Sequence, residues 1–361
     1  MKILQVLPEL KLAGAQIMVE NLARELKNMG NDLCIISLFS YHTPISERLE
    51  KDNIQIYYLD KKSGFDSSMI SKIRKIVRVF NPDVIHTHSY VLKYVYVATR
   101  NNHHAVRIHT IHNIAEKETT RANLMLEKFL IKKRITTPVA ISPQIEESIK
   151  GFYGIAAGQV PMIYNGISLN KCIPKYDYRF HDGVIRIIHI GRFEEQKNHE
   201  MIVEAIKILS NHYPNAQLFC FGEGSLEEKI RQQIEENKLD YNIKLVGLTD
   251  NPYAEITKSD LFILPSRWEG MPITLIEAMG SGMPIIATDV GGVTDMVSNG
   301  KSALICENNP KSLSDAIESL IQDMDLRYEL GNTAKKRAQF FSAEQMAKKY
   351  EELYLRLESC R

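Results

Sequence analysis

Short apolar runs alternate with longer amphipathic stretches through most of the chain, and this alternation limits the possible fold more than any other feature. Strand, helix and strand in repeated succession are typical of a parallel sheet covered by helices on both faces. In the first half, the pattern predicts strands near 2–7, 32–38, 83–86, 105–110, 138–141 and 161–163, with helices near 15–29, 67–80, 90–101, 120–134 and 143–150.

A second alternation of the same kind follows a polar stretch at 165–183, which begins with a turn at Asn165-Gly166. Its predicted strands lie near 184–190, 216–221, 243–246, 261–264, 284–287 and 303–305, and its helices near 198–212, 225–238, 272–280, 311–323, 325–340 and 343–358. We therefore expect an α/β protein with two doubly wound domains joined by a linker, at 1–170 and 171–342.

The composition is that of a soluble globular protein, with 44% apolar and 25% charged residues among 361. No apolar run approaches the roughly 18–20 residues that span a bilayer. The start of the chain is too short in its apolar part, and too soon acidic, for a signal peptide. Five scattered cysteines without paired spacing favour reduced thiols, so we expect a cytoplasmic protein.

Charge is distributed unevenly, with a net +8 in residues 1–172 and −7 in residues 173–361. Two predicted helices of the first half carry much of the basic charge, at Lys72, Arg74, Lys75, Arg78, Arg121, Lys128, Lys132, Lys133 and Arg134. The second of these helices is also amphipathic. It could lie against an anionic membrane surface, or pack its apolar face on the sheet and leave its charges in water. No nucleic-acid recognition motif accompanies the charge, so we expect no nucleic-acid partner.

The stretch from Leu264 to Thr288 contains the first candidate site. A buried strand ends at Pro265, and a helix opens after a polar turn, with Pro272 tolerated in its first turn. Backbone amides at such a helix start favour an anion. Glu269 precedes this start and Glu277 follows about two turns later, where each could hold hydroxyl groups of the same ligand. The amides belong to Gly270, Met271, Ile273 and Thr274.

A second candidate motif, GRFEEQKNH, follows the predicted strand at 184–190. Its Arg192 could bind a diphosphate through a forked guanidinium, and Lys197 could meet the same group as a point charge. Gly191 permits close approach of the backbone, and Asn198 is suited to cap the helix that follows. The two motifs together predict a site for a ligand that carries phosphate.

Four histidines, His86, His88, His109 and His112, lie near the ends of predicted strands. Their spacing completes no recognisable metal-ligand set with a carboxylate or a cysteine, so we expect no metal site. His86 and His88 are more simply interpreted as support for the end of the sheet or for an acceptor cleft.

Both motifs resemble those of the retaining GT-B glycosyltransferases of family 4, also called group 1. The resemblance lies in Glu269 and Glu277 at E-x7-E spacing, in their flanks P-S-x-x-E-G-x-P and E-A-M-x-x-G-x-P-I-I-A-T, and in G-R-F-x-x-Q-K-N-H. It implies two Rossmann-like domains, the first holding an acceptor and the second a nucleotide-sugar. It also implies that the final helix, in residues 343–361, crosses back to the first domain.

The resemblance assigns roles to individual residues. It implies that Arg192, Lys197 and the helix-start amides stabilise the leaving diphosphate, that Glu277 binds ribose hydroxyls and that Glu269 holds the donor sugar. Further assigned residues are His112 at the donor sugar, Leu248 at the nucleobase and Gly14 in a loop close to the ligand. This loop usually carries two glycines, and Ala13 stands in the first place here.

The implied activity is transfer of a sugar from a nucleotide diphosphate donor, with a UDP-sugar expected first, to a saccharide or lipid-linked saccharide acceptor. The resemblance further implies retention of configuration, no metal or other cofactor, and a role in capsule or lipopolysaccharide synthesis, with possible contact to the inner face of the cytoplasmic membrane. Two other classes remain open: a nucleotide-sugar 2-epimerase on the same scaffold and a non-catalytic nucleotide-sugar-binding protein.

Overall fold

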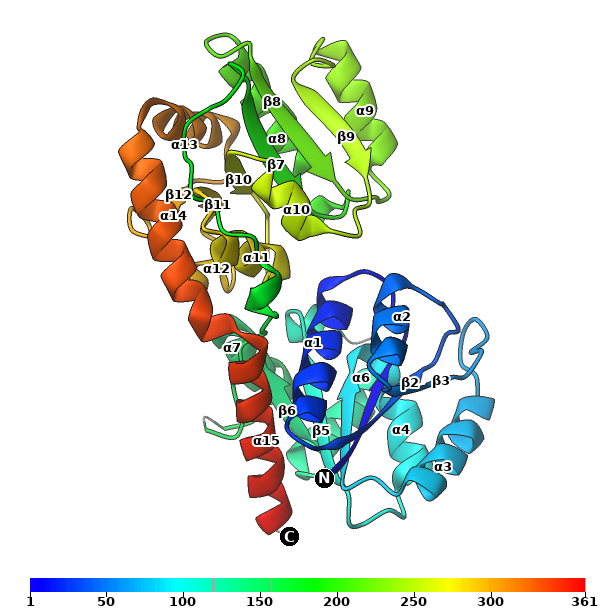
Figure 1. Cartoon of the computed structure of the whole chain (residues 1–361). Helices are drawn as coiled ribbons and strands as arrows, with labels where there is room; N and C mark the ends of the chain where they lie inside the picture. The colour runs from blue at the N-terminus through cyan, green and yellow to red at the C-terminus, as the bar shows by residue number, and fades with distance from the viewer. Residues whose placement is uncertain (119–120, 157, 361) are drawn as a thin grey trace. The chain divides into compact units, whose positions relative to one another are not determined.

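The structure is a computed structural model that describes residues 1–118, 121–156 and 158–360, and it divides into two compact units (Figure 1). Unit 1 contains residues 1–167 together with 342–361, and unit 2 contains Ser168–Phe341. The unit limits lie within three residues of the domain limits expected from the sequence. The last segment of the chain therefore belongs to the N-terminal unit.

Unit 1 contains a parallel sheet of six strands in the order β3-β2-β1-β4-β5-β6. Its strands are β1 (Lys2–Leu7), β2 (Asp32–Ser37), β3 (Gln55–Tyr58), β4 (Val84–His88), β5 (Val106–Ile111) and β6 (Thr137–Ala140). The stretch predicted as a strand at 161–163 contributes only an isolated bridge between Met162 and Ala140. The predicted α/β architecture of this half is thus confirmed.

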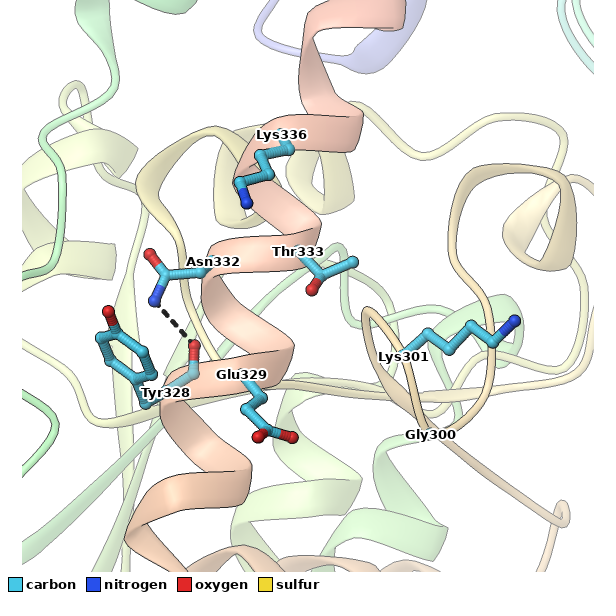
Figure 2. A pocket seen from close by; sticks show the side chains of 7 residues that line it. All are labelled: Gly300, Lys301, Tyr328, Glu329, Asn332, Thr333 and Lys336. Carbon is cyan, nitrogen blue, oxygen red and sulfur yellow. Dashed lines mark hydrogen bonds between the residues drawn. The ribbon is translucent and has the colours of Figure 1, made fainter.

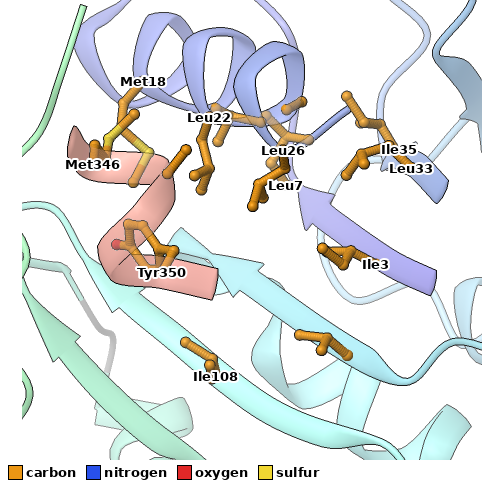
Figure 3. Packing of buried hydrophobic residues seen from close by; sticks show 14 of the residues in the cluster. Ile3, Leu7, Met18, Leu22, Leu26, Leu33, Ile35, Ile108, Met346 and Tyr350 are labelled. Atoms are coloured by element: carbon orange, nitrogen blue, oxygen red, sulfur yellow. The ribbon is translucent and has the colours of Figure 1, made fainter. Parts of the chain in front are cut away.

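Helices of unit 1 cover the sheet, and the last of them comes from the far end of the chain (Figure 1). They are α1 (Gly14–Asn28), α2 (Pro44–Lys51), α3 (Ser68–Phe80), α4 (Leu92–Thr99), α5 (Ala115–Glu118), α6 (Arg121–Lys132), α7 (Pro143–Tyr153) and α15 (Ala343–Ser359). Met346 and Tyr350 of α15 share one buried cluster with Met18 of α1 and Ile3 of β1 (Figure 3). Burial of these apolar side chains fixes α15 on unit 1.

Unit 2 repeats the architecture with a parallel sheet in the order β12-β11-β10-β7-β8-β9. Its strands are β7 (Ile185–Ile190), β8 (Ala216–Phe221), β9 (Ile243–Gly247), β10 (Leu261–Leu264), β11 (Ile285–Thr288) and β12 (Leu304–Cys306). Its helices are α8 (His199–Ser210), α9 (Glu227–Glu236), α10 (Pro252–Thr257), α11 (Ile273–Ser281), α12 (Val293–Met296), α13 (Pro310–Gln322) and α14 (Met324–Ala338). Among the described residues, no helix is both long and apolar enough to span a membrane.

Gly222, directly after β8, is required by the close approach of two loops. Its φ of 144° is in a region that other residues rarely adopt, and an added Cβ would overlap the carbonyl oxygen of Gly191. The amide of Gly222 also donates to the carbonyl of Gly247, 2.9 Å away. The ends of β7, β8 and β9 are therefore held together at one edge of the sheet.

We expect Gly222→Ala to destabilise unit 2 by roughly 1–3 kcal/mol, because both the backbone conformation and the Gly191 carbonyl must shift. Denaturant unfolding followed by circular dichroism measures the change. Gly151→Ala is the matched control: Gly151 lies within α7 with open space around its Cα, so this change should stabilise by about 0.5–1 kcal/mol. Equal midpoints for wild type and Gly222→Ala would contradict the stated packing.

Candidate active site

The two sequence motifs come together in unit 2. β7 and β10 are parallel neighbours, so the loops that follow them leave the same edge of the sheet. The amide of Arg267 donates to the carbonyl of Gln196 at 2.8 Å, and the Gln196 side chain donates to the carbonyl of Trp268 at 3.0 Å. These bonds dock the loop after β7 against the loop after β10.

Glu269 is the centre of this contact. Its carboxylate is 4% exposed and accepts hydrogen bonds from three side chains. The Lys197 ammonium lies 2.5 Å from Oε1 and the Ser266 hydroxyl 2.6 Å from the same oxygen, while the Gln196 amide lies 3.2 Å from Oε2. A buried carboxylate is stable only with such partners. The structure thus places Lys197 beside Glu269, and the roles of the two residues toward a ligand remain predictions.

The helix that follows Glu269 has an uncapped start. α11 begins at Ile273, and Pro272 at the N-cap position makes no side-chain capping bond. The amides of Ile273 and Thr274 therefore have no intrahelical partner and point out of the helix end. Gly270 and Met271 lie in the turn before the helix rather than within it. This end can bind an anion.

Glu277 lies in the second turn of α11 and is 2% exposed. Burial raises the pKa of its carboxyl to about 8, and a hydrogen bond with Tyr253 and the charge of Lys171 oppose this shift. Tyr253 lies at the start of α10. A buried carboxyl group of this kind is suited to accept hydrogen bonds from hydroxyl groups of a ligand.

The raised pKa of Glu277 predicts a pH dependence of stability. The folded state binds the Glu277 proton more tightly than the unfolded state, so its contribution is fully present below about pH 4.5 and is lost as the pH rises through about 8. Glu277→Gln removes this contribution. Between pH 5 and 8, we expect wild type to lose more unfolding free energy than the variant, by at most about 1.4 kcal/mol per pH unit. Parallel pH profiles of the two proteins would contradict the shift.

Arg192 is exposed, and its guanidinium makes no hydrogen bond or ion pair with any residue that the structure describes. The backbone around it is fixed, because the amide of Phe193 donates to the Glu223 carbonyl at 3.1 Å. Its charge lowers the pKa of Glu194, although hydrogen bonds from Ser225 have the larger effect there. Arg192 is therefore not among the contacts that join the two motifs.

Leu248 follows β9 at the same edge of the sheet and is 57% exposed. The backbone bond between Gly222 and Gly247 places the start of this loop next to β8. An exposed apolar side chain here could cover a flat ring. Its assignment to a nucleobase remains a prediction.

Asn198 corrects one detail of the sequence interpretation. It stands at the N-cap position of α8 but adopts a left-handed conformation with φ of 56°, and its side chain makes no capping bond. Its amide nitrogen instead donates to Asn308 at 2.8 Å, and its oxygen accepts from Arg267 at 3.2 Å. The side chain thus joins loops and does not cap the start of α8.

The predicted residues of unit 1 lie at the carboxyl ends of its strands. Gly14 is the first residue of α1 and is exposed. Ala13, in place of the first glycine of the family, has φ of −152°, a conformation that any residue adopts. His112 follows β5, where its Nε2 lies 3.0 Å from Nδ1 of His88. The meeting of His112 with the residues of unit 2 remains a prediction.

Three polar residues at the site were missed by sequence reasoning. Ser266 and Gln196 bind Glu269, and Tyr253 binds Glu277. Ser266 and Gln196 lie inside the two recognised motifs, so their position in these motifs could have identified them as site residues. Nothing in the sequence marks Tyr253.

A shallow pocket elsewhere in unit 2 contains none of these residues (Figure 2). It lies between α14 and the turn before β12, and the Asn332 amide donates to the Tyr328 carbonyl at 3.0 Å beside it. Its lining residues are Gly300, Lys301, Tyr328, Glu329, Asn332, Thr333 and Lys336. No member of either motif contributes to it.

No group of three His, Cys, Asp or Glu side chains within the described ranges is placed to hold a metal ion. The pair Asp323 and Asp325 resembles a metal-binding D-x-D only in sequence. Asp323 caps α14 by accepting from the amide of Leu326 at 2.9 Å. Its role is structural.

Comparison with known proteins agrees with this geometry. Residues 177–337 match the model of "Glycosyl transferases group 1", and residues 12–171 match that of "Glycosyltransferase Family 4". A crystal structure of Anabaena HepE, in complex with UDP and glucose, superposes with a TM-score of 0.84, 18% identity and 98% and 99% coverage of the two chains. The fold is therefore the two-domain GT-B fold.

Relatives in sequence have the same class of activity in their names. An uncharacterized glycosyltransferase of Methanocaldococcus jannaschii is 29% identical over 95% of each chain. The Escherichia coli UDP-Gal:alpha-D-GlcNAc-diphosphoundecaprenol alpha-1,3-galactosyltransferase is 25% identical, covering 80% of this chain and 79% of its own. The protein belongs to the family 4, group 1 glycosyltransferases.

Proposed function

We propose that the chain transfers a sugar from a nucleotide diphosphate donor, with a UDP-sugar as the first candidate, to a saccharide or lipid-linked saccharide, with retention of configuration. The observation that carries the proposal is the contact of Lys197 with Glu269 directly before the uncapped start of α11. It sets a cation, a carboxylate and the helix-start amides of Ile273 and Thr274 at one edge of one sheet. A sugar diphosphate needs these three groups together.

In the proposed mechanism, breaking the anomeric bond builds negative charge on the leaving diphosphate. Arg192, Lys197 and the amides at the start of α11 stabilise this charge as it grows. Glu269 holds donor-sugar hydroxyls, and Glu277 accepts hydrogen bonds from the ribose. His112, from unit 1, contacts the donor sugar. The leaving phosphate helps to take the proton of the acceptor on the same face of the sugar.

Two relatives support the choice of ligands. Anabaena HepE was crystallised with UDP and glucose, and the Escherichia coli relative is named for a UDP-galactose donor and a diphosphoundecaprenol-linked acceptor. By analogy with these relatives, we extend the proposal to the synthesis of cell-surface polysaccharide, such as capsule or lipopolysaccharide.

The test is incubation of labelled UDP- and GDP-sugars with and without saccharide acceptors, followed by NMR of the product. The proposal expects a new glycoside with the anomeric configuration of the donor. Formation of an epimer without acceptor would instead identify a 2-epimerase, and tight binding without turnover would identify a binding protein. An inverted product would contradict retention.

We also expect the reaction to proceed without a metal ion, because cationic side chains and amides supply the positive charge that a divalent ion would supply. Addition of a chelator should leave kcat unchanged within error. A strict need for Mg²⁺ or Mn²⁺, restored by adding the ion back, would contradict the metal-free mechanism.

A peripheral contact with the membrane is a further part of the proposal. On α6, Met125 is 82% exposed and Phe129 is 49% exposed, next to the basic Lys128 and Lys132. Such a surface fits an anionic bilayer interface. By contrast, Arg74 of α3 donates to backbone carbonyls of α4, so its charge is used within the unit. Sedimentation with anionic vesicles should carry down wild type more than Met125→Ser/Phe129→Ser, and equal recovery would contradict the contact.

A further inference from the structure

Three side chains at the carboxyl ends of neighbouring strands of unit 1 form a hydrogen-bonded chain that ends on His112. Gln5 lies in β1, His88 is the last residue of β4, and His112 follows β5. β4 pairs in parallel with both β1 and β5. Gln5 lies opposite His86 in the first pairing, and His88 lies opposite Thr110 in the second. Since side chains two residues apart share a face of a sheet, all three belong to one face.

One hydrogen bond of this chain is buried and the other is partly buried. The Oε1 atom of Gln5 lies 2.7 Å from Nε2 of His88, whose Nδ1 lies 3.0 Å from Nε2 of His112. Gln5 is 0% exposed and His88 is 1% exposed. The remaining ring nitrogen of His112, Nδ1, is buried and has no hydrogen-bond partner among the described residues.

These contacts determine where the protons lie. The amide oxygen of Gln5 faces His88, while Nε2 of Gln5 is buried without a partner among the described residues. An amide oxygen only accepts, so in this arrangement Nε2 of His88 carries a proton and donates it to Gln5. Nδ1 of a neutral His88 is then an acceptor, and the proton between the two histidines belongs to Nε2 of His112. Burial lowers the pKa of His88 well below its usual range and that of His112 to about 3, so both rings stay neutral near pH 7. Nδ1 of His112 is left with a bare lone pair.

The other two histidines of this sheet edge, His86 and His109, differ from His112 because neither of them, among the described residues, has a buried ring nitrogen without a partner. Both ring nitrogens of His86 have partners, Tyr354 at 2.8 Å and Thr110 at 2.7 Å. His109 contacts Thr87 through Nδ1 at 2.9 Å. A buried polar atom without a partner costs free energy, and in a native protein it calls for a reason. At His112, a ligand hydroxyl group would provide the missing donor.

We propose that Gln5 and His88 are positioning residues that keep the proton of His112 on Nε2 and so present Nδ1 as an acceptor to a sugar hydroxyl. The proposal rests on the proposed function, in which His112 meets the donor sugar. It adds the direction of the hydrogen bond: the sugar donates and the protein accepts. A histidine with the opposite tautomer would meet the same hydroxyl as a donor.

The tautomer can be measured without any assay of transfer. Two-bond nitrogen–proton correlation spectra of the full chain, labelled with 15N-histidine, report which ring nitrogen carries the proton, and His112→Gln identifies the His112 signals. We expect a protonated Nε2 and a bare Nδ1 in wild type. A protonated Nδ1 would overturn the proposal, because the chain of bonds would then run in the opposite direction.

Variants of His88 test how its hydrogen bond with His112 affects the transfer reaction. His88→Leu removes both bonds, and we expect mixed tautomers of His112 and a fall in kcat of about 10–100-fold, the usual effect of losing the partner that orients a functional histidine. His88→Asn, whose side-chain oxygen can replace Nδ1, should recover most of this loss. Tyr354→Phe is the matched control, since it removes an equally buried hydrogen bond from the neighbouring His86.

A loss in His88→Leu no greater than in Tyr354→Phe would overturn the proposal, as would an unchanged His112 tautomer. Should His88→Leu fail to fold, the wild-type spectrum alone decides the matter. A wild-type chain that transfers no sugar from any donor would contradict the proposed function, while the tautomer spectrum would still support or refute the arrangement of Gln5, His88 and His112.

Discussion

Lys197→Met is expected to lower kcat by about 10²–10³-fold, because it removes one of the groups that stabilise charge on the leaving diphosphate. The same change affects the fold. Lys197 is the cationic partner of Glu269, which is 4% exposed, and breaking such a pair typically costs about 3–5 kcal/mol. The bonds from Ser266 and Gln196 remain and reduce this cost. Steady-state kinetics and denaturant unfolding measure the two effects separately.

The double variant Lys197→Met/Glu269→Gln separates stability from catalysis. It removes the unpaired charge, so we expect it to regain much of the lost stability while remaining inactive. Lys229→Met is the matched control, since Lys229 pairs with Glu200 in the same unit at an exposed position, and it should change neither quantity measurably. Recovery of turnover in the double variant would show that Lys197 acts only by neutralising Glu269.

Arg192→Ala should produce a loss of the same order, about 10²–10³-fold in kcat, with almost no effect on stability. The guanidinium is exposed and makes no hydrogen bond or ion pair among the described residues, so the folded state does not depend on it. Substitutions at such positions usually change stability by less than about 0.5 kcal/mol. Kinetics at saturating donor, together with a thermal melt, provide the measurement.

Arg231→Ala is the control for Arg192, because Arg231 is also an exposed arginine of unit 2 and pairs, among the described residues, only with Glu227 on its own helix. It should retain normal turnover. Near-normal turnover in Arg192→Ala would remove this residue from the mechanism and leave Lys197 and the start of α11 as the diphosphate site.

The buried strands could be predicted from the sequence as short apolar runs, and most helices could be predicted from their amphipathic period. The strand predicted at 216–221 agrees with β8, and the helix predicted at 15–29 differs from α1 by one residue at each end. The short elements β3, α2, α5, α10 and α12 were missed. Each of these elements buries at most three of its residues, which leaves neither an apolar run nor a clear period, and its existence depends on packing against distant parts of the chain.

The candidate site could be predicted as two motifs but not as an arrangement. Lys197 and Glu269 are 72 residues apart, and their contact depends on β7 and β10 being neighbours in the sheet. No local sequence pattern indicates which strands are neighbours. The same holds for His88 and His112, joined through the pairing of β4 with β5. For Asn198, the local sequence predicted a role that the structure does not show. Its residue type favours a helix cap, but contacts with Asn308 and Arg267 determine its conformation instead.

Binding of a diphosphate by Arg192, Lys197 and the start of α11 can be measured by calorimetric titration. UDP and uridine are titrated into wild type, Arg192→Ala and Lys197→Met, with GDP and guanosine as the parallel pair. Each charge-assisted bond contributes about 1.5–3 kcal/mol, so one diphosphate should bind wild type at least about 10²-fold more tightly than its nucleoside. We predict that this ratio falls about tenfold or more in each variant, and a ratio that stays the same in both would contradict the account.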